Sequence, residues 1–295
     1  MFTDIPIDTP IIAGLLILLH TDPPAGDLAE ALALNEAQWT SVVALATDEH
    51  VHPYLYWNLQ RLAALSALPE ALRQQLHAGY MGNTARNRAL LHYVEQILTA
   101  FAARDLPVIV LKGTYLVDQV YPTPGARAVG DTDLLVPPDR IAEAVAVLEE
   151  LGYAGRAPFS PSSLNIRKHL DIYQRAGHAV ELHFELMDPH EPLPVPVAEI
   201  WQRAVPATVA GCPAFVLAPE DQLLHLCIHG TLQHQLNFDM RFLTDIVVYS
   251  QYAAQQLNWP LLVARVRHMR WSHSVWLALT LASRLLGAPI PPEVC

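Results

Sequence analysis

The chain has 295 residues, of which 52% are apolar and 16% are charged, with a formal net charge of −11. This balance excludes an intrinsically disordered chain and fits one large globular domain or two to three smaller ones. The acidic total disfavours extended nucleic-acid binding, which needs clustered Lys and Arg. Eight of the 18 Lys and Arg nevertheless lie between Arg104 and Arg175, which is compatible with a local phosphate pocket.

The sequence has no signature of membrane insertion or secretion. The apolar run at 11–19 is shorter than the roughly 20 residues of a membrane-spanning helix. The residues before it include Asp4 and Asp8 but no Lys or Arg, unlike the cationic start of a signal peptide. The three cysteines are scattered and form no CxxC pair. We therefore expect a cytoplasmic protein that has no membrane partner.

Taken in chain order, the predicted elements change from helical to mixed and back. Apolar residues at three- and four-residue spacing predict helices from about 10 to 90, and a further helix over 83–103. A β-branched run at 107–111 predicts a buried strand, followed by a helix at 115–121, a strand at 131–136 and a helix at 140–151. Segments 169–174 and 179–186 predict a hairpin, and the chain is helical again from 219.

These elements predict an α/β (α+β) protein. A small mixed sheet is expected at the core, over residues 91–190. Helical regions over 1–90 and 191–295 are expected to flank this core on either side in the sequence.

Two carboxylates on the second predicted strand are the most informative pair in the chain. Because side chains alternate along a strand, Asp131 and Asp133 share one face and Thr132 faces the other. Such close like charges are costly unless a cation neutralises them, and hard oxygen ligands suit Mg²⁺. The alternative is an exposed strand edge, but the pair lies among apolar residues that favour burial.

The first predicted strand ends in Lys112, Gly113 and Thr114 just before a helix. This geometry presents backbone N–H groups to phosphate, with Gly113 allowing close approach and Lys112 or Thr114 adding donors. A purely conformational reason for the Gly is the alternative. Arg127, just before the carboxylate strand, can bind phosphate oxygens or remain a solvated loop residue.

A third acidic position lies on the predicted strand at 179–186. Glu181, His183 and Glu185 alternate with apolar residues, so they share one face. That face is either exposed to solvent or forms a third wall of the acidic pocket. In the second case Glu181 or Glu185 completes a site of three carboxylates.

Segments 111–136, 151–153, 180–186 and 217–246 together resemble the bacterial uncharacterised nucleotidyltransferase family of the DNA polymerase beta-like superfamily. The resemblance covers about residues 85 to 250. It implies a nucleotidyltransferase fold for the mixed core. It also implies that Asp131, Asp133 and Glu181 are catalytic metal ligands, and that Gly113 and Thr114 clasp the triphosphate. Here Gly-Thr replaces the usual Gly-Ser or Gly-Gly, and the gap to Asp131 is longer.

The resemblance implies Mg²⁺ (or Mn²⁺) as cofactor and a nucleoside triphosphate as substrate. A nucleoside monophosphate would pass to a hydroxyl of a small molecule, a peptide or protein, or an RNA end, and pyrophosphate would leave. Glu181 is expected to help remove the hydroxyl proton. Lys112 and Arg127 are expected to offset the triphosphate charge. The alternative is a catalytically silent nucleotide-binding or antitoxin-like module.

The C-terminal helical region contains a second polar group. His225 and His229 are four residues apart, a spacing that can bind zinc, and His234, Arg241 and Asp245 follow. Zinc would make the chain a metal-dependent hydrolase. No third ligand is evident, so we expect His229, Arg241 and Asp245, together with His183, to line the cleft instead.

Overall fold

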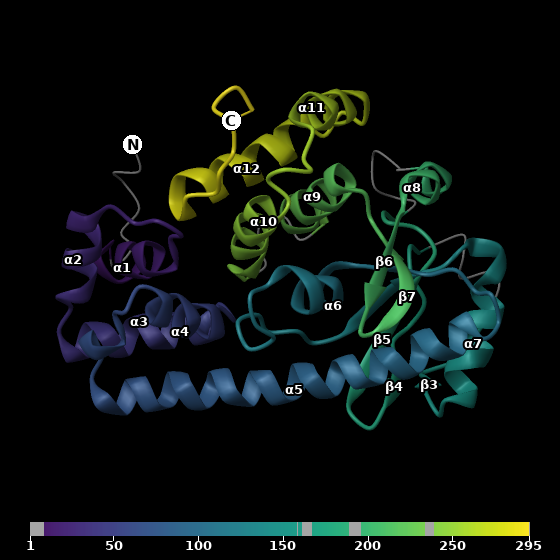
Figure 1. Ribbon diagram of the computed structural model, residues 1–295, viewed down its shortest axis with the longest axis horizontal. Coiled ribbons are helices and arrows are strands. Elements are labelled where there is room, and N and C mark those ends of the chain that lie inside the picture. The colour runs from purple at the N-terminus through teal and green to yellow at the C-terminus, as the bar shows by residue number, and fades with distance from the viewer. Residues whose placement is uncertain (1–8, 158, 161–166, 189–195, 234–238, 295) are drawn as a thin grey trace.

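A mixed β-sheet lies between a long helix on one side and a group of C-terminal helices on the other (Figure 1). The structure is a computed structural model, and it describes residues 9–157, 159–160, 167–188, 196–233 and 239–294. This arrangement confirms the predicted α/β core with helical flanks.

The sheet has seven strands in the order β3-β4-β5-β2-β1-β7-β6. The strands are β1 (Ile109–Val110), β2 (Thr132–Leu135), β3 (Ala154–Gly155), β4 (Tyr173–Arg175), β5 (His178–His183), β6 (Val205–Val209) and β7 (Cys212–Val216). β2 is central, antiparallel to β1 and parallel to β5. All four β2 residues are buried, because helices cover both faces of the sheet.

The predicted β4–β5 hairpin is confirmed, with shorter strands than expected. Ala176 and Gly177 both have positive φ, at 48° and 82°, which is the backbone of a tight two-residue hairpin turn. The segment before β4 pairs with β5 only through an isolated bridge between His169 and His183.

The N-terminal region is helical, as predicted, with α1 (Thr9–Leu19), α2 (Ala25–Leu32), α3 (Glu36–Asp48), α4 (His52–Arg61) and a 3₁₀ turn η1 (Leu65–Ala67). A capping box starts α3: the Asn35 side chain accepts from the Gln38 backbone N–H, and the Gln38 side chain accepts from that of Asn35.

Helix α5 (Glu70–Ala102) is 33 residues long and runs beneath the sheet in Figure 1. It is joined to the sheet by a hydrogen bond from Arg175 Nη1 to Gln96 Oε1 at 2.9 Å. α7 (Ile141–Glu150) packs beside it, after the short turn η3 (Pro138–Arg140). Helix α5 continues through residue 90, so the predicted boundary between the N-terminal helical region and the mixed core lies within one helix. The division into these regions remains a proposal.

The segment 191–295 is not purely helical, which corrects the sequence expectation. β6 and β7 form a hairpin whose turn residues, Ala210 and Gly211, have positive φ. Pro206 and Pro213 interrupt the strand pattern in the sequence, but Pro is tolerated on β6 because it is the edge strand.

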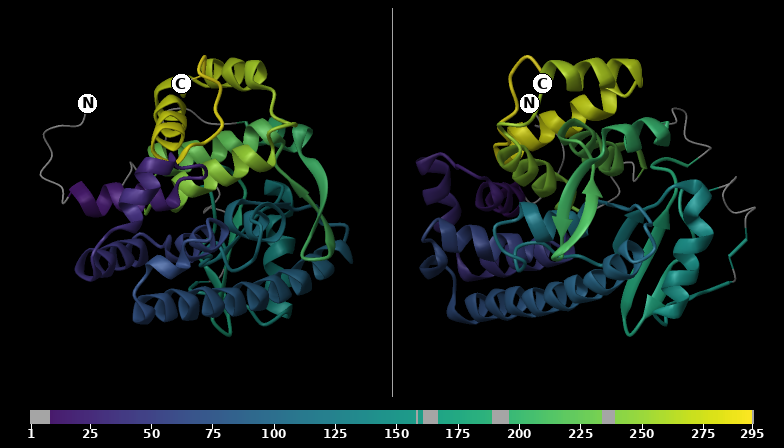
Figure 2. Two further views of the ribbon diagram at one scale, coloured as in Figure 1. Left: turned by 60° about the vertical axis from the view of Figure 1, so that its left-hand side comes forward. Right: turned by 45° about the vertical axis from the view of Figure 1, so that its right-hand side comes forward.

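The remaining helices form the opposite layer. They are α6 (Lys112–Tyr115), the π-helix η2 (Leu116–Val120), α8 (Val197–Arg203), α9 (Pro219–Ile228), the π-helix η5 (His229–Gln233), α10 (Arg241–Tyr252), α11 (Trp259–His268) and α12 (Ser272–Leu286). α1 packs against α12, so the two helical regions meet directly (Figure 2). None of the described helices is both long and apolar enough to cross a membrane.

Candidate active site

Strands β2 and β5 bring the predicted acids together. They pair in parallel register with Asp133 opposite Glu181, and Asp131 immediately precedes β2. Paired residues of neighbouring strands project to the same face of a sheet. Asp131, Asp133 and Glu181 therefore line one pocket, with a volume of about 420 Å³.

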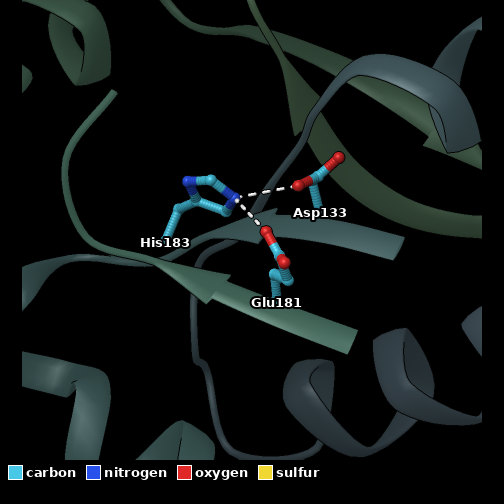
Figure 3. A group of neighbouring side chains, drawn as sticks. All are labelled: Asp133, Glu181 and His183. Carbon is cyan, nitrogen blue, oxygen red and sulfur yellow. Dashed lines mark hydrogen bonds and ion pairs between the residues drawn. The ribbon is translucent and has the colours of Figure 1, made fainter. Parts of the chain in front are cut away.

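His183 also belongs to this cluster (Figure 3). Its Nε2 lies 2.9 Å from Asp133 Oδ1 and 3.5 Å from Glu181 Oε2. Nε2 donates to Asp133, because an ionised carboxylate only accepts. His183 is 2% exposed, so this imidazole fixes the positions of the two acids from behind.

Charge is concentrated where the three acids meet. Burial and the neighbouring Asp133 carboxylate raise the pKa of Asp131 to about 6. Burial alone would also raise the pKa of Asp133, but the Lys112 ammonium and the hydrogen bond from His183 hold it well below its usual range. Lys112 Nζ lies 3.2 Å from Asp133 Oδ1. The site thus combines like charges that repel with a cation that partly offsets them.

The donor set fits a divalent cation. One ligand atom each from Asp133, Glu181 and His183 lie within 4.8 Å of one another, and no other such group occurs in the described ranges. Carboxylate oxygens suit Mg²⁺ and also Mn²⁺. His183 Nε2 directs its hydrogen at Asp133, so this imidazole orients the acids and is not a ligand in this arrangement. Asp131, on the same pocket wall, adds a further carboxylate.

Lys112 and Gly113 also line the pocket, at the start of α6. Lys112 has φ 35°, a strained value for a residue with a side chain. A Cβ at Gly113 would lie 2.7 Å from Arg127 Nη1 and 3.2 Å from Val129 Cγ1. Gly113 is therefore required by the close approach of Arg127, and it leaves backbone open toward the pocket.

The structure does not bring the Thr114 side chain to the pocket. The helix begins at Lys112 instead of at 115, so Thr114 turns into the core, where it is 0% exposed. Its Oγ1 donates to Thr132 Oγ1 at 3.4 Å. Thr132 in turn bonds His178 Nε2 at 2.9 Å, and Tyr153 bonds His178 Nδ1 at 2.7 Å. A hydrogen-bonded chain thus supports β2 on the face opposite the acids.

Arg127 lines the pocket but is held by Asp245, from α10. Nε and Nη2 of Arg127 donate to the two Asp245 oxygens at 2.6 and 2.7 Å. Tyr121 donates to Asp245 Oδ1 at 2.8 Å. This buried bidentate pair fixes the loop before β2 to the C-terminal helices, a structural task that the sequence did not indicate.

His229 and Arg241 line the pocket, at the sites where η5 and α10 begin. Arg241 donates to Asp239 through Nε and Nη2, and to the Ala128 carbonyl through Nη1 at 3.2 Å. His225 lies outside the pocket, and burial lowers its pKa well below the usual range. The paired His do not join a metal-binding group among the described residues, and His234 lies outside them.

Five pocket-lining residues were not singled out in the sequence: Gly130, Lys168, His169, Leu226 and Phe242. His169 lies in the predicted strand at 169–174, but nothing in its spacing distinguished it. Phe242 and Leu226 lie on separate helices, α10 and α9. These helices reach the pocket through tertiary packing, which the periodicity of the sequence does not predict.

Solved structures provide one comparison. A solution structure of the antibiotic-resistance factor ANT(2'')-Ia is 15% identical, with 63% of this chain and 97% of that chain covered and a TM-score of 0.44. A crystal structure of ANT(2'')-Ia with adenylyl-2''-tobramycin is 14% identical, with 62% and 98% covered and a TM-score of 0.44. An antigenic nucleotidyltransferase-like protein from Paracoccidioides brasiliensis is 16% identical, with 64% and 92% covered and a TM-score of 0.36.

Sequence comparisons are more informative. No curated protein matches the chain. A family described as "uncharacterised nucleotidyltransferase" matches residues 35–287, which is most of the chain and includes every site residue named above. The chain therefore belongs to the uncharacterised nucleotidyltransferase family.

Proposed function

We propose that the protein is a divalent-metal-dependent nucleotidyltransferase. It moves a nucleoside monophosphate from a nucleoside triphosphate to a hydroxyl of an acceptor. The observation that carries this proposal is the convergence of Asp131, Asp133 and Glu181 on one pocket that also has Lys112 and Gly113 in its wall. Membership of the nucleotidyltransferase family supports it.

The three carboxylates would hold Mg²⁺ or Mn²⁺, with His183 fixing two of them by its position between Asp133 and Glu181. A cation bound there would neutralise phosphate charge and polarise the phosphorus centre. The register of β2 and β5, which sets Asp133 opposite Glu181, supports this assignment.

The phosphate side of the pocket is assigned to Lys112, Gly113 and Arg127. Lys112 provides an ammonium group, and the backbone at Gly113 can approach phosphate oxygens closely. Arg127 is bound to Asp245, so its charge is largely balanced and its role is to shape this wall. The acceptor hydroxyl gives its proton to a basic side chain of the pocket as its oxygen bonds to the α-phosphorus. The bond from the α-phosphorus to the bridging oxygen breaks, and pyrophosphate leaves with that electron pair.

The test is transfer of label from each of the four α-³²P nucleoside triphosphates to components of a fractionated cell extract, with Mg²⁺ or Mn²⁺. We expect a labelled product with the unaltered protein and a loss of at least about 10³-fold with Asp131→Asn or Asp133→Asn, because a ligand charge is removed. The matched control is Asp171→Asn, at an exposed ion pair with Arg167 outside the pocket.

Either Asn variant transferring at the unaltered rate would overturn the proposal. Metal-dependent binding of a triphosphate without any transfer would instead make the chain a nucleotide-binding or antitoxin-like module. Thermal unfolding of each variant shows whether the fold is retained.

A further inference from the structure

His169 is fixed to the strand that carries Glu181. Its backbone forms a bridge with His183. On either side, the Leu170 amide donates to the Leu182 carbonyl at 2.9 Å, and the Phe184 amide donates to the Lys168 carbonyl at 3.0 Å. Hydrogen bonds on both sides hold the residue, so its side chain enters the pocket from a set position.

The hydrogen bonding of the His169 ring identifies which nitrogen carries the proton. Nδ1 lies 2.8 Å from the Leu170 carbonyl oxygen, which can only accept, so Nδ1 is the donor. In the neutral ring, Nε2 then has a free lone pair. The side chain is 30% exposed, and Nε2 lies 3.8 Å from Glu181 Oε2 on the pocket side.

The two neighbouring imidazoles therefore have opposite orientations. The His169 and His183 ring centroids are 4.9 Å apart. His183 directs its N–H at Asp133 and is almost completely buried, whereas His169 directs its N–H at the backbone and its lone pair at the pocket. Nε2 of His169 and Oε2 of Glu181 are thus two acceptors beside one space, an arrangement complementary to a group that brings a hydrogen.

We propose that His169 is a catalytic residue that binds the acceptor hydroxyl through Nε2 and receives its proton during transfer, which assigns the acceptor to the alcohols. This rests on the proposed function and replaces Glu181 as the residue expected to remove that proton. A phosphate dianion or a carboxylate brings no proton, so it would gain nothing from this nitrogen.

The acceptor oxygen forms a bond to the α-phosphorus, and its proton passes to Nε2 of His169. The bond from the α-phosphorus to the bridging oxygen breaks, and its electron pair leaves with pyrophosphate. Because the His169 side chain is 30% exposed, the ring can then return the proton to solvent.

Two substitutions separate the two nitrogens. In His169→Asn the amide N–H can replace Nδ1–H toward Leu170, but nothing replaces Nε2. In His169→Gln the longer amide can place an oxygen near the Nε2 position, so it can still orient a hydroxyl. The control is His92→Asn, at an exposed histidine on α5 outside this pocket.

The experiment has two readouts with each variant. One is the dissociation constant of a ribose-labelled fluorescent ATP analogue with Mn²⁺. The other is kcat and KM for label transfer to the acceptor fraction found with the unaltered protein. We expect the dissociation constant to stay within about twofold, kcat to fall about 10²- to 10⁴-fold in His169→Asn, and His169→Gln to recover at least about tenfold of this loss.

The outcomes distinguish this proposal from the one on which it rests. Absence of metal-dependent analogue binding by the unaltered protein would refute both. Binding with no transfer by the unaltered protein would also refute both, because it would leave a nucleotide-binding module. Transfer by His169→Asn at more than a third of the unaltered rate, or equal loss of kcat in the Asn and Gln variants, would overturn the role of His169 alone. A labelled product in which the nucleotide is joined to a phosphate or a carboxylate, as an anhydride, would do the same.

Discussion

His178 is a buried histidine whose two ring nitrogens are both used inside the protein. Thr132 and Tyr153 are its partners, and Tyr93 of α5 stacks on it with centroids 5.1 Å apart and planes at 7°. Burial, with Arg175 nearby, lowers the pKa of His178 to about 4. Because Thr132 lies between Asp131 and Asp133, the charge state of this ring affects the support of β2.

The pH dependence of stability is predicted from this shift. The unfolded chain takes up a proton near pH 6.5 and the folded chain only near 4, so the stabilising contribution is fully present above pH 6.5 and is lost as the pH falls toward 4. Urea unfolding at pH 7.5 and 4.5 measures it. Between pH 7.5 and pH 4.5 we expect the free energy of unfolding to fall by about 2 kcal/mol less in His178→Gln than in the unaltered protein. Equal losses would contradict the assignment.

At the scale of residues, the acids could be predicted and several partners could not. Strand alternation places Asp131 and Asp133 on one face, but it leaves Glu181 and Glu185 equally eligible as the third acid. The family resemblance selects Glu181, and the register of β2 and β5 places it opposite Asp133. Thr114 is predicted to contact phosphate, but its side chain lies in the core. The reason is that α6 begins at Lys112, only two residues after β1 ends. The sequence does not indicate His169, because the proposed role of this residue depends on the hydrogen bond from its ring to the Leu170 carbonyl. Composition and residue spacing do not reveal that bond.

At the scale of elements, α5 positions the loop that leads into β2. Asn83 Nδ2 donates to the Gly125 and Arg127 carbonyls, both at 2.9 Å. Asn87 Nδ2 donates to the Pro124 and Arg127 carbonyls at 2.6 and 2.7 Å. Both asparagines are at most 1% exposed, so two turns of one helix satisfy the carbonyls of a loop that has no strand partner.

Removing one of these asparagines tests the role of the helix. Asn87→Ala leaves two loop carbonyls with fewer donors, and we expect a loss of about 1–3 kcal/mol in the free energy of unfolding by urea. Transfer activity should fall with it, since Arg127 belongs to this loop. Arg88→Ala, at an exposed position of the same helix, is the control and should change stability by no more than about 0.5 kcal/mol. Equal effects would show that the loop is held in another way.

The elements themselves were predictable to different degrees. The hairpin around Gly177 has a clear turn signal between alternating strands, and this prediction is confirmed. The sequence does not predict the β6–β7 hairpin, because Pro206 and Pro213 argue locally against strands. In the fold Pro206 lies on β6, at the sheet edge, where a missing N–H is tolerated. Pro213 lies on β7, which pairs with β1 only at Phe215, two residues further on. Sequence periodicity does not reveal which strand lies at an edge.

At the scale of the whole molecule, the two helical regions close on each other. The Thr21 amide donates to the Leu286 carbonyl at 3.1 Å, and Thr21 Oγ1 donates to the Gly287 carbonyl at 3.1 Å. Gly287 ends α12 in the left-handed conformation, with φ 71°. A Cβ there would lie 2.3 Å from His20 Cε1. Contact between the two regions was not predictable, because periodicity indicates which face of a helix is buried but not what covers it.

Gly287→Ala should therefore destabilise the protein by about 2–4 kcal/mol, from the left-handed backbone and from overpacking against His20. Gly26→Ala is the matched control: nothing lies within 4 Å of its Cβ position, it is in α2, and the change should be neutral or stabilising by up to about 1 kcal/mol. Urea midpoints and slopes measure both. A Gly287 variant as stable as the control would mean that the two regions are not tightly packed there.

The pairing of Asp133 with Glu181 across β2 and β5 has a consequence for insertions and deletions. If one residue were added to or removed from β5, Glu181 would turn to the opposite face of the sheet, where Thr132 and His178 lie. Asp133 would remain on the pocket face. Length changes within β5 should thus be far less tolerated than length changes at the hairpin tip around Gly177, even though neither alters an acidic residue. The number of residues along β5 therefore determines whether the acids share the pocket face.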